Sequence, residues 1–223
     1  MIRRAMVVVA GGSGRRMASS IPKQFLDLSG KSIVFNTLSS FVAFDPEMRL
    51  VVVLPEAELV RKKDLEHIAT DMVFTAGGET RFHSVKNGLA HCRDAEYIGI
   101  HDGVRPFVSH ATVQKTFDAA EAYGSGVPFL PVTQSLRWVE EGGNRALNRA
   151  QVVSIQTPQT FKSELLFEAF EQDYQEHFTD DANVVESYGH SIHLIEGNAE
   201  NIKITTPLDL VLARDLIEKG WKV

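Results

Sequence analysis

The hydrophobic pattern of the chain begins with two short stretches that are apolar throughout and rich in β-branched residues. They are residues 6–10 (MVVVA) and 50–54 (LVVVL). A continuous apolar run of this length is typical of a strand that is covered on both faces, as in a parallel sheet. Shorter apolar runs predict further strands at residues 72–75, 97–101, 127–130, 152–155 and 192–195.

Stretches with helical spacing separate these strands. The clearest of the early ones, residues 33–43, carries a broad apolar stripe that includes Ile33, Leu38 and Phe41. Similar patterns predict helices near residues 56–69, 79–91, 110–122, 163–174 and 180–188. The alternation predicts an α/β protein whose mostly parallel sheet is covered by helices on both faces. In such sheets ligands bind at the carboxyl ends of the strands.

The last predicted helix begins at a clear boundary. Thr206 is a good capping residue and Pro207 suits the first turn of a helix. Apolar residues then recur at helical spacing, and we expect them to form one face of the helix. They are Leu208, Val211, Leu212 and Leu216.

Residues 131–150 (PVTQSLRWVEEGGNRALNRA) interrupt the alternation of strands and helices. Two short stretches of mixed polar and apolar residues flank a Gly-Gly pair, which predicts a β-hairpin. Leu136 and Trp138 are apolar and need cover. The hairpin is either a solvated surface feature or an arm that packs on a second subunit, and the sequence leaves both interpretations open.

Composition narrows the class of protein. The chain has 223 residues, a formal net charge of −6 and 43% apolar residues, which suits one globular domain. An acidic chain lacks the broad basic surface of nucleic-acid-binding proteins, so any phosphate ligand must be held by a local basic pocket. Cys92 is the single cysteine, and we expect it to be an inert buried residue. No apolar segment approaches the roughly 20 residues that cross a bilayer, so we expect a cytoplasmic protein with no membrane partner.

A glycine-rich turn follows the first predicted strand, in the sequence VVVAGGSGRRM at residues 7–17. Glycines let phosphate oxygens approach backbone N–H groups without a Cβ in the way, and Arg15, Arg16 and Lys23 add positive charge nearby. The alternative is a tight turn with solvated arginines. The turn lacks the lysine and hydroxyl of a P-loop, and Met17 stands where the dinucleotide fingerprint has glycine. We therefore interpret it as a third kind of phosphate-binding loop.

Several motifs, in order along nearly the whole chain, carry a resemblance to a known family. They are AGGSGRRM (10–17), PKQF (22–25), GGETRFHSV (77–85), HDGVRPFVS (101–109), TPQTF (157–161), TDDA (179–182) and EGNAENIKITTPLDL (196–210). The chain resembles the sugar-phosphate nucleotidyltransferases, and among them the 2-C-methyl-D-erythritol 4-phosphate cytidylyltransferases. The resemblance implies a three-layer, Rossmann-like nucleotidyltransferase fold in a single domain of residues 1–223, with the hairpin as an arm.

The implied reaction joins CTP and a polyol phosphate into a CDP-polyol and pyrophosphate, in the non-mevalonate route to isoprenoids. The resemblance gives Arg16 and Lys23 the stabilisation of the transition state, and Arg149 and Lys203 the placement of the acceptor's phosphate. Such cations would offset the repulsion between two anionic reactants. The residues that it places around the triphosphate are Ala10, Gly11, Gly12, Ser13, Gly14 and Arg15.

The resemblance also implies contacts to the base and to a metal ion. Gly77, Gly78 and the Ser84 hydroxyl would contact cytosine, although Ser84 facing a neighbouring helix is the alternative. Asp102, at the end of a predicted strand, would hold Mg²⁺ against phosphate oxygens, with Glu200 as a second ligand. The remaining implied ligand contacts are Arg105, Ser135, Thr157 and Thr179. The threonine of TDDA is equally well explained as the start of a helix.

One departure from the family affects the acceptor. Residues 134–137 are QSLR, where the family commonly has Asp-Thr-x-Lys. Ser135 keeps a hydroxyl and Arg137 keeps a charge, but Gln134 lacks the carboxylate. Ribitol 5-phosphate is therefore an alternative acceptor, and a non-catalytic nucleotide-binding domain is an alternative of another class. We expect a homodimer that is joined through the hairpin arm.

Overall fold

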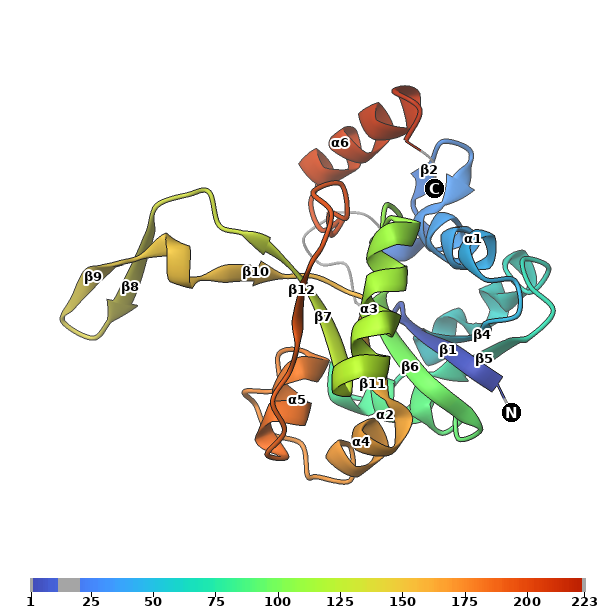
Figure 1. The fold of residues 1–223 in the computed structure, drawn as a ribbon. Helices are drawn as coiled ribbons and strands as arrows, with labels where there is room; N and C mark the ends of the chain where they lie inside the picture. Colours follow the sequence, from blue (N-terminus) through green and yellow to red (C-terminus); the bar gives the residue numbers. More distant parts are fainter. Residues whose placement is uncertain (1, 12–20, 222–223) are drawn as a thin grey trace.

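The sheet expected from the apolar runs forms the centre of the molecule (Figure 1). The computed structural model describes residues 2–11 and 21–221. The strands of the main sheet are β1 (Ile2–Val9), β4 (Arg49–Leu54), β5 (Met72–Ala76), β6 (Ala95–Asp102), β7 (Ser125–Pro131), β10 (Val153–Ile155), β11 (Gln159–Lys162) and β12 (Leu194–Glu196). Their order is β10-β7-β11-β6-β1-β4-β5, with β12 beside β7.

The central strands finish at one edge of the sheet. β1 pairs in parallel with β4 and with β6, so that Val9 lies between Val53 and Asp102 in register. β5 continues the parallel arrangement beside β4. β11 runs antiparallel between β6 and β7. The carboxyl ends of β1, β4, β5 and β6 therefore meet at the same edge, where a ligand is expected in such sheets.

Helices cover both faces of the sheet. They are α1 (Ile33–Phe44), α2 (Arg81–Leu89), α3 (His110–Tyr123), α4 (Ser163–Ala169), α5 (Asp181–Ser187) and α6 (Pro207–Glu218), with 3-10 turns η2 (Lys23–Phe25), η3 (Glu56–Asp64) and η4 (Arg149–Gln151). Ala5 and Val7 of β1 face the cluster that α2, α4 and α5 cover, and Met6 and Val8 face the cluster under α1 and α3. This alternation of buried residues is the two-faced burial that the continuous apolar run predicts.

The fold agrees with the α/β class expected from the sequence, and each predicted strand is present. Several elements differ from expectation. The helix expected at 56–69 is the 3-10 helix η3, in which no residue is buried, so it has no apolar stripe to hold a longer α-helix against the core. The apolar pattern also did not predict β11 or the small hairpin of β2 (Asp27–Leu28) and β3 (Lys31–Ser32).

The interruption at residues 131–150 forms an antiparallel hairpin of β8 (Leu136–Glu140) and β9 (Gly143–Leu147). Figure 1 shows this hairpin arm projecting away from the body of the molecule. Gly142 has a φ of 89° at the turn, a conformation that favours glycine. Val139 is 77% exposed and Trp138 is 51% exposed, so the arm lacks an apolar partner within the described part of this chain.

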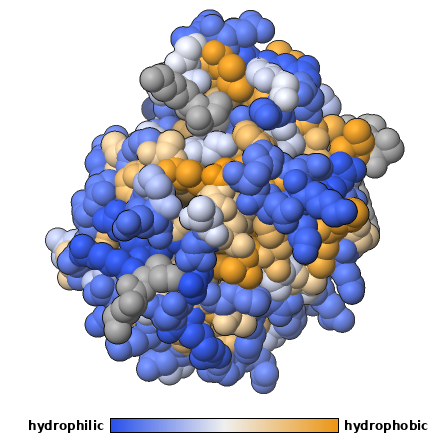
Figure 2. Space-filling model, turned by 90° about the vertical axis from the view of Figure 1, so that its right-hand side faces the viewer, coloured by the Kyte–Doolittle hydropathy of each residue, from blue (hydrophilic) through white to orange (hydrophobic). Residues whose placement is uncertain are grey.

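Helix α6 presents apolar residues to the outside. Thr206 and Asp209 form a capping box and Pro207 occupies the first turn, as the sequence predicts. Leu208 and Val211 are nevertheless 76% and 61% exposed, because Leu210, Ala213, Leu216 and Ile217 supply the face that packs on the body. Figure 2 shows apolar surface at the top of the molecule, at the height of α6 in Figure 1.

Candidate active site

A cavity of about 350 Å³ opens at the edge where the central strands end. The segments that follow β1, β5 and β6 form its walls, together with η2, the start of α2 and the segment before α6. The lining residues are Val9, Ala10, Gly11, Lys23, Gln24, Gly78, Glu79, Thr80, Arg81, Ser84, Asp102, Val104 and Lys203. Many of the sequence-predicted site residues therefore share one cavity, as expected for residues at the ends of neighbouring parallel strands.

Two glycines allow neighbouring turns at the cavity to pack closely against each other. A Cβ on Gly103 would lie 2.8 Å from Cβ of Ala10, because the chains that leave β1 and β6 touch there. A Cβ on Gly78 would lie 2.4 Å from Cβ of His83, at the entry to α2. Real Cβ atoms do not approach so closely, so both positions require glycine for close packing of the turns.

One end of the cavity is built around the Ser84 hydroxyl. Ser84 Oγ donates to the carbonyl of Thr80 at 2.9 Å and accepts from the N–H of Gly78 at 3.0 Å. A Cβ on Gly77 would lie 3.0 Å from this oxygen and one on Gly11 would lie 3.9 Å away. The structure thus brings together the glycines and the serine that the resemblance assigned to cytosine. Within the described residues, the hydroxyl holds the turn instead of facing a neighbouring helix.

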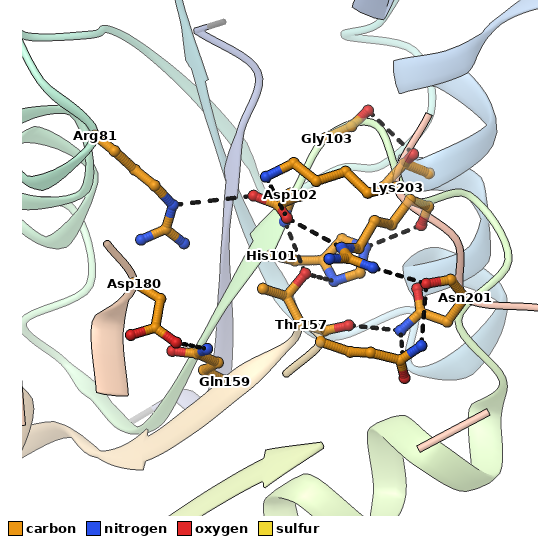
Figure 3. A network of polar contacts seen from close by, with 12 residues as sticks. Arg81, His101, Asp102, Gly103, Thr157, Gln159, Asp180, Asn201 and Lys203 are labelled. Atoms are coloured by element: carbon orange, nitrogen blue, oxygen red, sulfur yellow. Dashed lines mark hydrogen bonds and ion pairs between the residues drawn. The ribbon is translucent and has the colours of Figure 1, made fainter. Parts of the chain in front are cut away.

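The other end of the cavity is an ion cluster around Asp102 (Figure 3). Its Oδ2 lies 3.0 Å from Nε of Arg105 and 3.1 Å from Nζ of Lys203. Its Oδ1 lies 3.9 Å from Nε of Arg81. Burial alone would raise the pKa of Asp102, but the charges of these three cations outweigh it and hold that pKa well below its usual range. The carboxylate is therefore charged at neutral pH and its surroundings are cationic.

Hydrogen bonds behind the cavity fix the position of Asp102. Its backbone N–H donates to Oγ1 of Thr157 at 3.1 Å, and that hydroxyl lies 3.1 Å from Nδ1 of His101. Nε2 of His101 lies 3.0 Å from the carbonyl of Arg105, which can only accept, so Nε2 carries the proton and Nδ1 accepts from Thr157. Burial lowers the pKa of His101 to about 4, which keeps the ring neutral in this tautomer.

A second layer of this network reaches the segment before α6. Nη1 of Arg105 donates to the carbonyl of Asn201 at 2.8 Å. Nδ2 of Asn201 in turn donates to the carbonyl of Thr157 at 2.7 Å. The loop that carries Lys203 is therefore tied to the same residues that hold Asp102, which aligns the lysine with the carboxylate.

Comparison with known proteins identifies the family of the chain that forms this cavity. The family model described as IspD, 2-C-methyl-D-erythritol 4-phosphate cytidylyltransferase, matches residues 4–219. Proteins of that name from Phocaeicola vulgatus and Porphyromonas gingivalis are 44% and 46% identical, over 97% and 96% of this chain and 100% and 98% of their own. The chain belongs to the 2-C-methyl-D-erythritol 4-phosphate cytidylyltransferase family. The crystal structure of the cytidylyltransferase from Thermus thermophilus, 32% identical, matches the fold with a TM-score of 0.78 over 98% of this chain and 100% of that one.

Not every residue implied by the cytidylyltransferase resemblance lies at the cavity. Arg149 is in η4 and Ser135 precedes β8, so both are on the exposed hairpin arm. Thr179 is exposed and donates to Oδ1 of Asn183 at 2.6 Å, while Asp180, and not Thr179, caps α5. Thr157 lies behind Asp102 instead of on the cavity wall. The expected residues Gly12, Ser13, Gly14, Arg15 and Arg16 lie outside the described residues.

The donor atoms around the cavity limit how the Mg²⁺ expected in a cytidylyltransferase could be held. Glu200 accepts from Nδ2 of Asn198 at 3.1 Å and does not line the cavity with Asp102. Among the described residues no group of three or more His, Cys, Asp or Glu side chains is gathered as a metal cluster. Mg²⁺ is commonly held by one or two carboxylates together with substrate phosphates. Asp102 fits that pattern, because it lines the cavity and, across residues 2–11 and 21–221, its Oδ1 has only the 3.9 Å contact to Arg81.

Arg81 and Gln24 are among the cavity residues that were not singled out from the sequence. Arg81 stands inside the motif GGETRFHSV, but its role depends on Asp181, which lies 100 residues away. Gln24 is fully buried, and within the described part of the chain neither of its amide atoms has a hydrogen-bond partner. Its position next to Lys23 in the PKQF motif was the sequence feature that could have marked Gln24 as a cavity residue. No helix of the described residues has the length and apolar character needed to cross a membrane.

Proposed function

We propose that this chain transfers the cytidylyl group of CTP to 2-C-methyl-D-erythritol 4-phosphate and releases pyrophosphate. The observation that carries the proposal is the cavity itself. In a chain of this family, it joins a glycine-lined end around Ser84 to a cationic end around Asp102. The first end suits a base that must be read by hydrogen bonds, and the second suits phosphoryl groups. Full-length relatives of this name favour methylerythritol phosphate over ribitol 5-phosphate as the acceptor.

The chemistry requires charge stabilisation and positioning. An oxygen of the acceptor's phosphate attacks the α-phosphorus of CTP, the bond to the β-phosphate breaks, and pyrophosphate leaves with the bonding electrons. Both reactants are anions, so cations must offset their repulsion and the charge that collects on the leaving group. Three cations, Lys23, Arg81 and Lys203, line the cavity against two carboxylates, Glu79 and Asp102, so its charged lining residues carry a net positive charge.

Individual roles follow from position. Lys23 lines the cavity, and we assign it the stabilisation of the transition state together with Arg16. Lys203 lies beside Asp102 and would place the acceptor's phosphate. Asp102 would hold Mg²⁺, which when bound supplies positive charge to the phosphates. The contacts of Gly77, Gly78 and the Ser84 turn with cytosine complete the assignment.

We also propose that the chain acts as one domain in a homodimer, joined through the hairpin arm. The exposed Trp138 and Val139 on the arm and the exposed Leu208 and Val211 on α6 are apolar surfaces that a second copy would cover. Arg149 is on the arm, whereas Lys203 lines the cavity. An arm from the partner would therefore bring an arginine to the same acceptor phosphate that Lys203 would bind. A cytoplasmic location stays a prediction from the sequence.

The assay that tests the function measures pyrophosphate release from pure protein with CTP, Mg²⁺ and methylerythritol phosphate. We expect turnover with this acceptor and at least about tenfold lower kcat/KM with ribitol 5-phosphate, the discrimination that unpaired polar groups in a site produce. A preference for ribitol 5-phosphate would overturn the acceptor. Tight CTP binding without turnover on either acceptor would favour the non-catalytic domain.

A further inference from the structure

Arg81 reaches into the cavity while it is anchored from behind. Its Nη1 and Nη2 donate to the two carboxylate oxygens of Asp181 at 2.8 and 2.6 Å, a paired contact that fixes the plane of the guanidinium group. The Asp181 side chain is 1% exposed, whereas that of Arg81 is 25% exposed and lines the cavity. One side of the guanidinium group is therefore buried against its anchor and the other faces the space for a ligand.

The anchor is itself held in place. Asp180 caps α5, and its Oδ2 accepts from Nε2 of Gln159 at 2.8 Å (Figure 3). Oε1 of Gln159 accepts from the backbone N–H of Ala182 at 2.8 Å. The first turn of α5 is thus tied to β11 on both sides of Asp181, which holds the backbone that carries this aspartate. A cation on such a support is pre-organised, which is the arrangement that stabilises charge in a substrate.

The guanidinium group keeps donors for a second partner. It carries five N–H groups, and Asp181 engages one on each Nη. Nε lies 3.9 Å from Oδ1 of Asp102, too far for a hydrogen bond, and it points toward Asp102 in Figure 3; both residues line the cavity. Nε and the adjacent Nη form the second edge of the planar fork, and this edge matches two oxygens of a phosphate.

The position of Arg81 along the cavity decides which phosphate it would reach. Arg81 and Ser84 are three residues apart on α2, so they share one face of the helix and both line the cavity. Ser84 marks the end assigned to the base. The phosphate bonded to the ribose is the nearest to the base in any cytidine nucleotide. Resting on the proposed function, we infer that Arg81 binds the α-phosphate of the nucleotide through Nε and the adjacent Nη.

The test measures the binding of cytidine and of CMP to the full chain by titration calorimetry. Arg81→Gln combined with Asp181→Asn removes both charges together, so that no unpaired carboxylate stays buried. We expect this double variant to bind cytidine as the parent does, while the advantage of CMP over cytidine falls by roughly tenfold or more, as for the loss of a hydrogen bond to a charged group.

A matched control removes another ion pair. Arg49→Gln with Asp71→Asn removes the 3.2 Å pair of these residues at the start of β4, and also the 2.6 Å contact of Arg49 with the half-exposed Asp94; both lie away from the cavity, so the advantage of CMP should be unchanged. The inference is overturned if the Arg81/Asp181 double variant keeps the parent's advantage. It is also overturned if Arg81→Gln alone loses that advantage and the added Asp181→Asn restores it, because Arg81 would then serve only its anchor. A parent that binds neither ligand would instead overturn the proposed function.

Discussion

The cavity edge and the hairpin arm differ in how their positions are determined. Asp102 is 7% exposed and is held by three cations and by the hydroxyl of Thr157, so its place follows from contacts within one chain. On the arm, Val139 is 77% exposed, and among the described strands β8 and β9 pair only with each other. A two-stranded hairpin is at best marginally stable by itself. The base and phosphate ends are thus held by contacts within one chain, whereas the described residues of one chain supply no such contacts to the arm, which is where the proposed dimer would act.

The largest expected effect comes from a cation of the cavity edge. Lys203→Ala should lower kcat/KM by roughly 100-fold or more, since it removes a donor aimed at phosphoryl charge. Stability should fall by only about 1–3 kcal/mol, because the lysine side chain is 41% exposed and Arg105 and Arg81 still face the buried carboxylate of Asp102. Steady-state kinetics and urea unfolding measure the two quantities.

Lys219→Ala is the matched control for this lysine. Lys219 also pairs with an aspartate, Asp215 at 2.7 Å, but on exposed α6 surface, and its loss should leave kcat/KM unchanged. A large loss of stability with nearly normal turnover in Lys203→Ala would show that the lysine holds the fold instead of the substrate.

The second effect concerns the arm. Trp138→Ser with Val139→Ser should weaken a dimer by roughly 30-fold or more, the usual result of truncating a buried aromatic anchor at an interface. The free energy of unfolding of the body should be nearly unchanged, since both side chains are exposed in the single chain. Sedimentation at micromolar concentration measures the association, with Glu141→Ser at the tip of the arm as the control. A parent protein that sediments as a monomer would contradict the dimer.

The smallest effect compares one glycine in each region. Gly78→Ala places a Cβ against His83 and should cost about 1–3 kcal/mol and weaken cytidine binding, because the turn that Ser84 holds must shift. Gly143→Ala meets nothing within 4 Å on the arm and should stay within about 0.5 kcal/mol of the parent. Urea unfolding and calorimetry with cytidine check both. Equal effects of the two substitutions would show that the cavity turn is not closely packed.

The central sheet was predictable because its signal is local. The apolar runs of β1 and β4 are continuous, and parallel strands place their carboxyl ends at one edge, so a ligand cavity at that edge follows from the pattern. The named residues of the cavity came from the family resemblance, not from this pattern. Gly12 to Arg16 lie outside the described residues, and their roles stay predictions.

The missed features depend on contacts far apart in the sequence. Strand β11 has four residues, of which Gln159 and Thr160 are polar yet buried. Their side chains hydrogen-bond the first turn of α5 and Thr116 of α3, while β6 and β7 pair with the strand's backbone. Nothing in its sequence resembles an apolar strand. Helix α6 has apolar residues on two sides, so periodicity could not decide which side packs on the body. The role of Arg81 could not be predicted without knowing that Asp181 lies next to it in the fold.

The reversed direction of β11 has a consequence for how the catalytic edge can change. A parallel strand sends only its exit loop to that edge, but β11 brings its entry segment, and with it the Thr157 hydroxyl that meets His101 and the Asp102 N–H. Another parallel strand would need a crossover of a dozen or more residues to add one loop there. With one short antiparallel strand, the fold places a further hydrogen-bonding segment beside Asp102, and it needs only a few residues to do so.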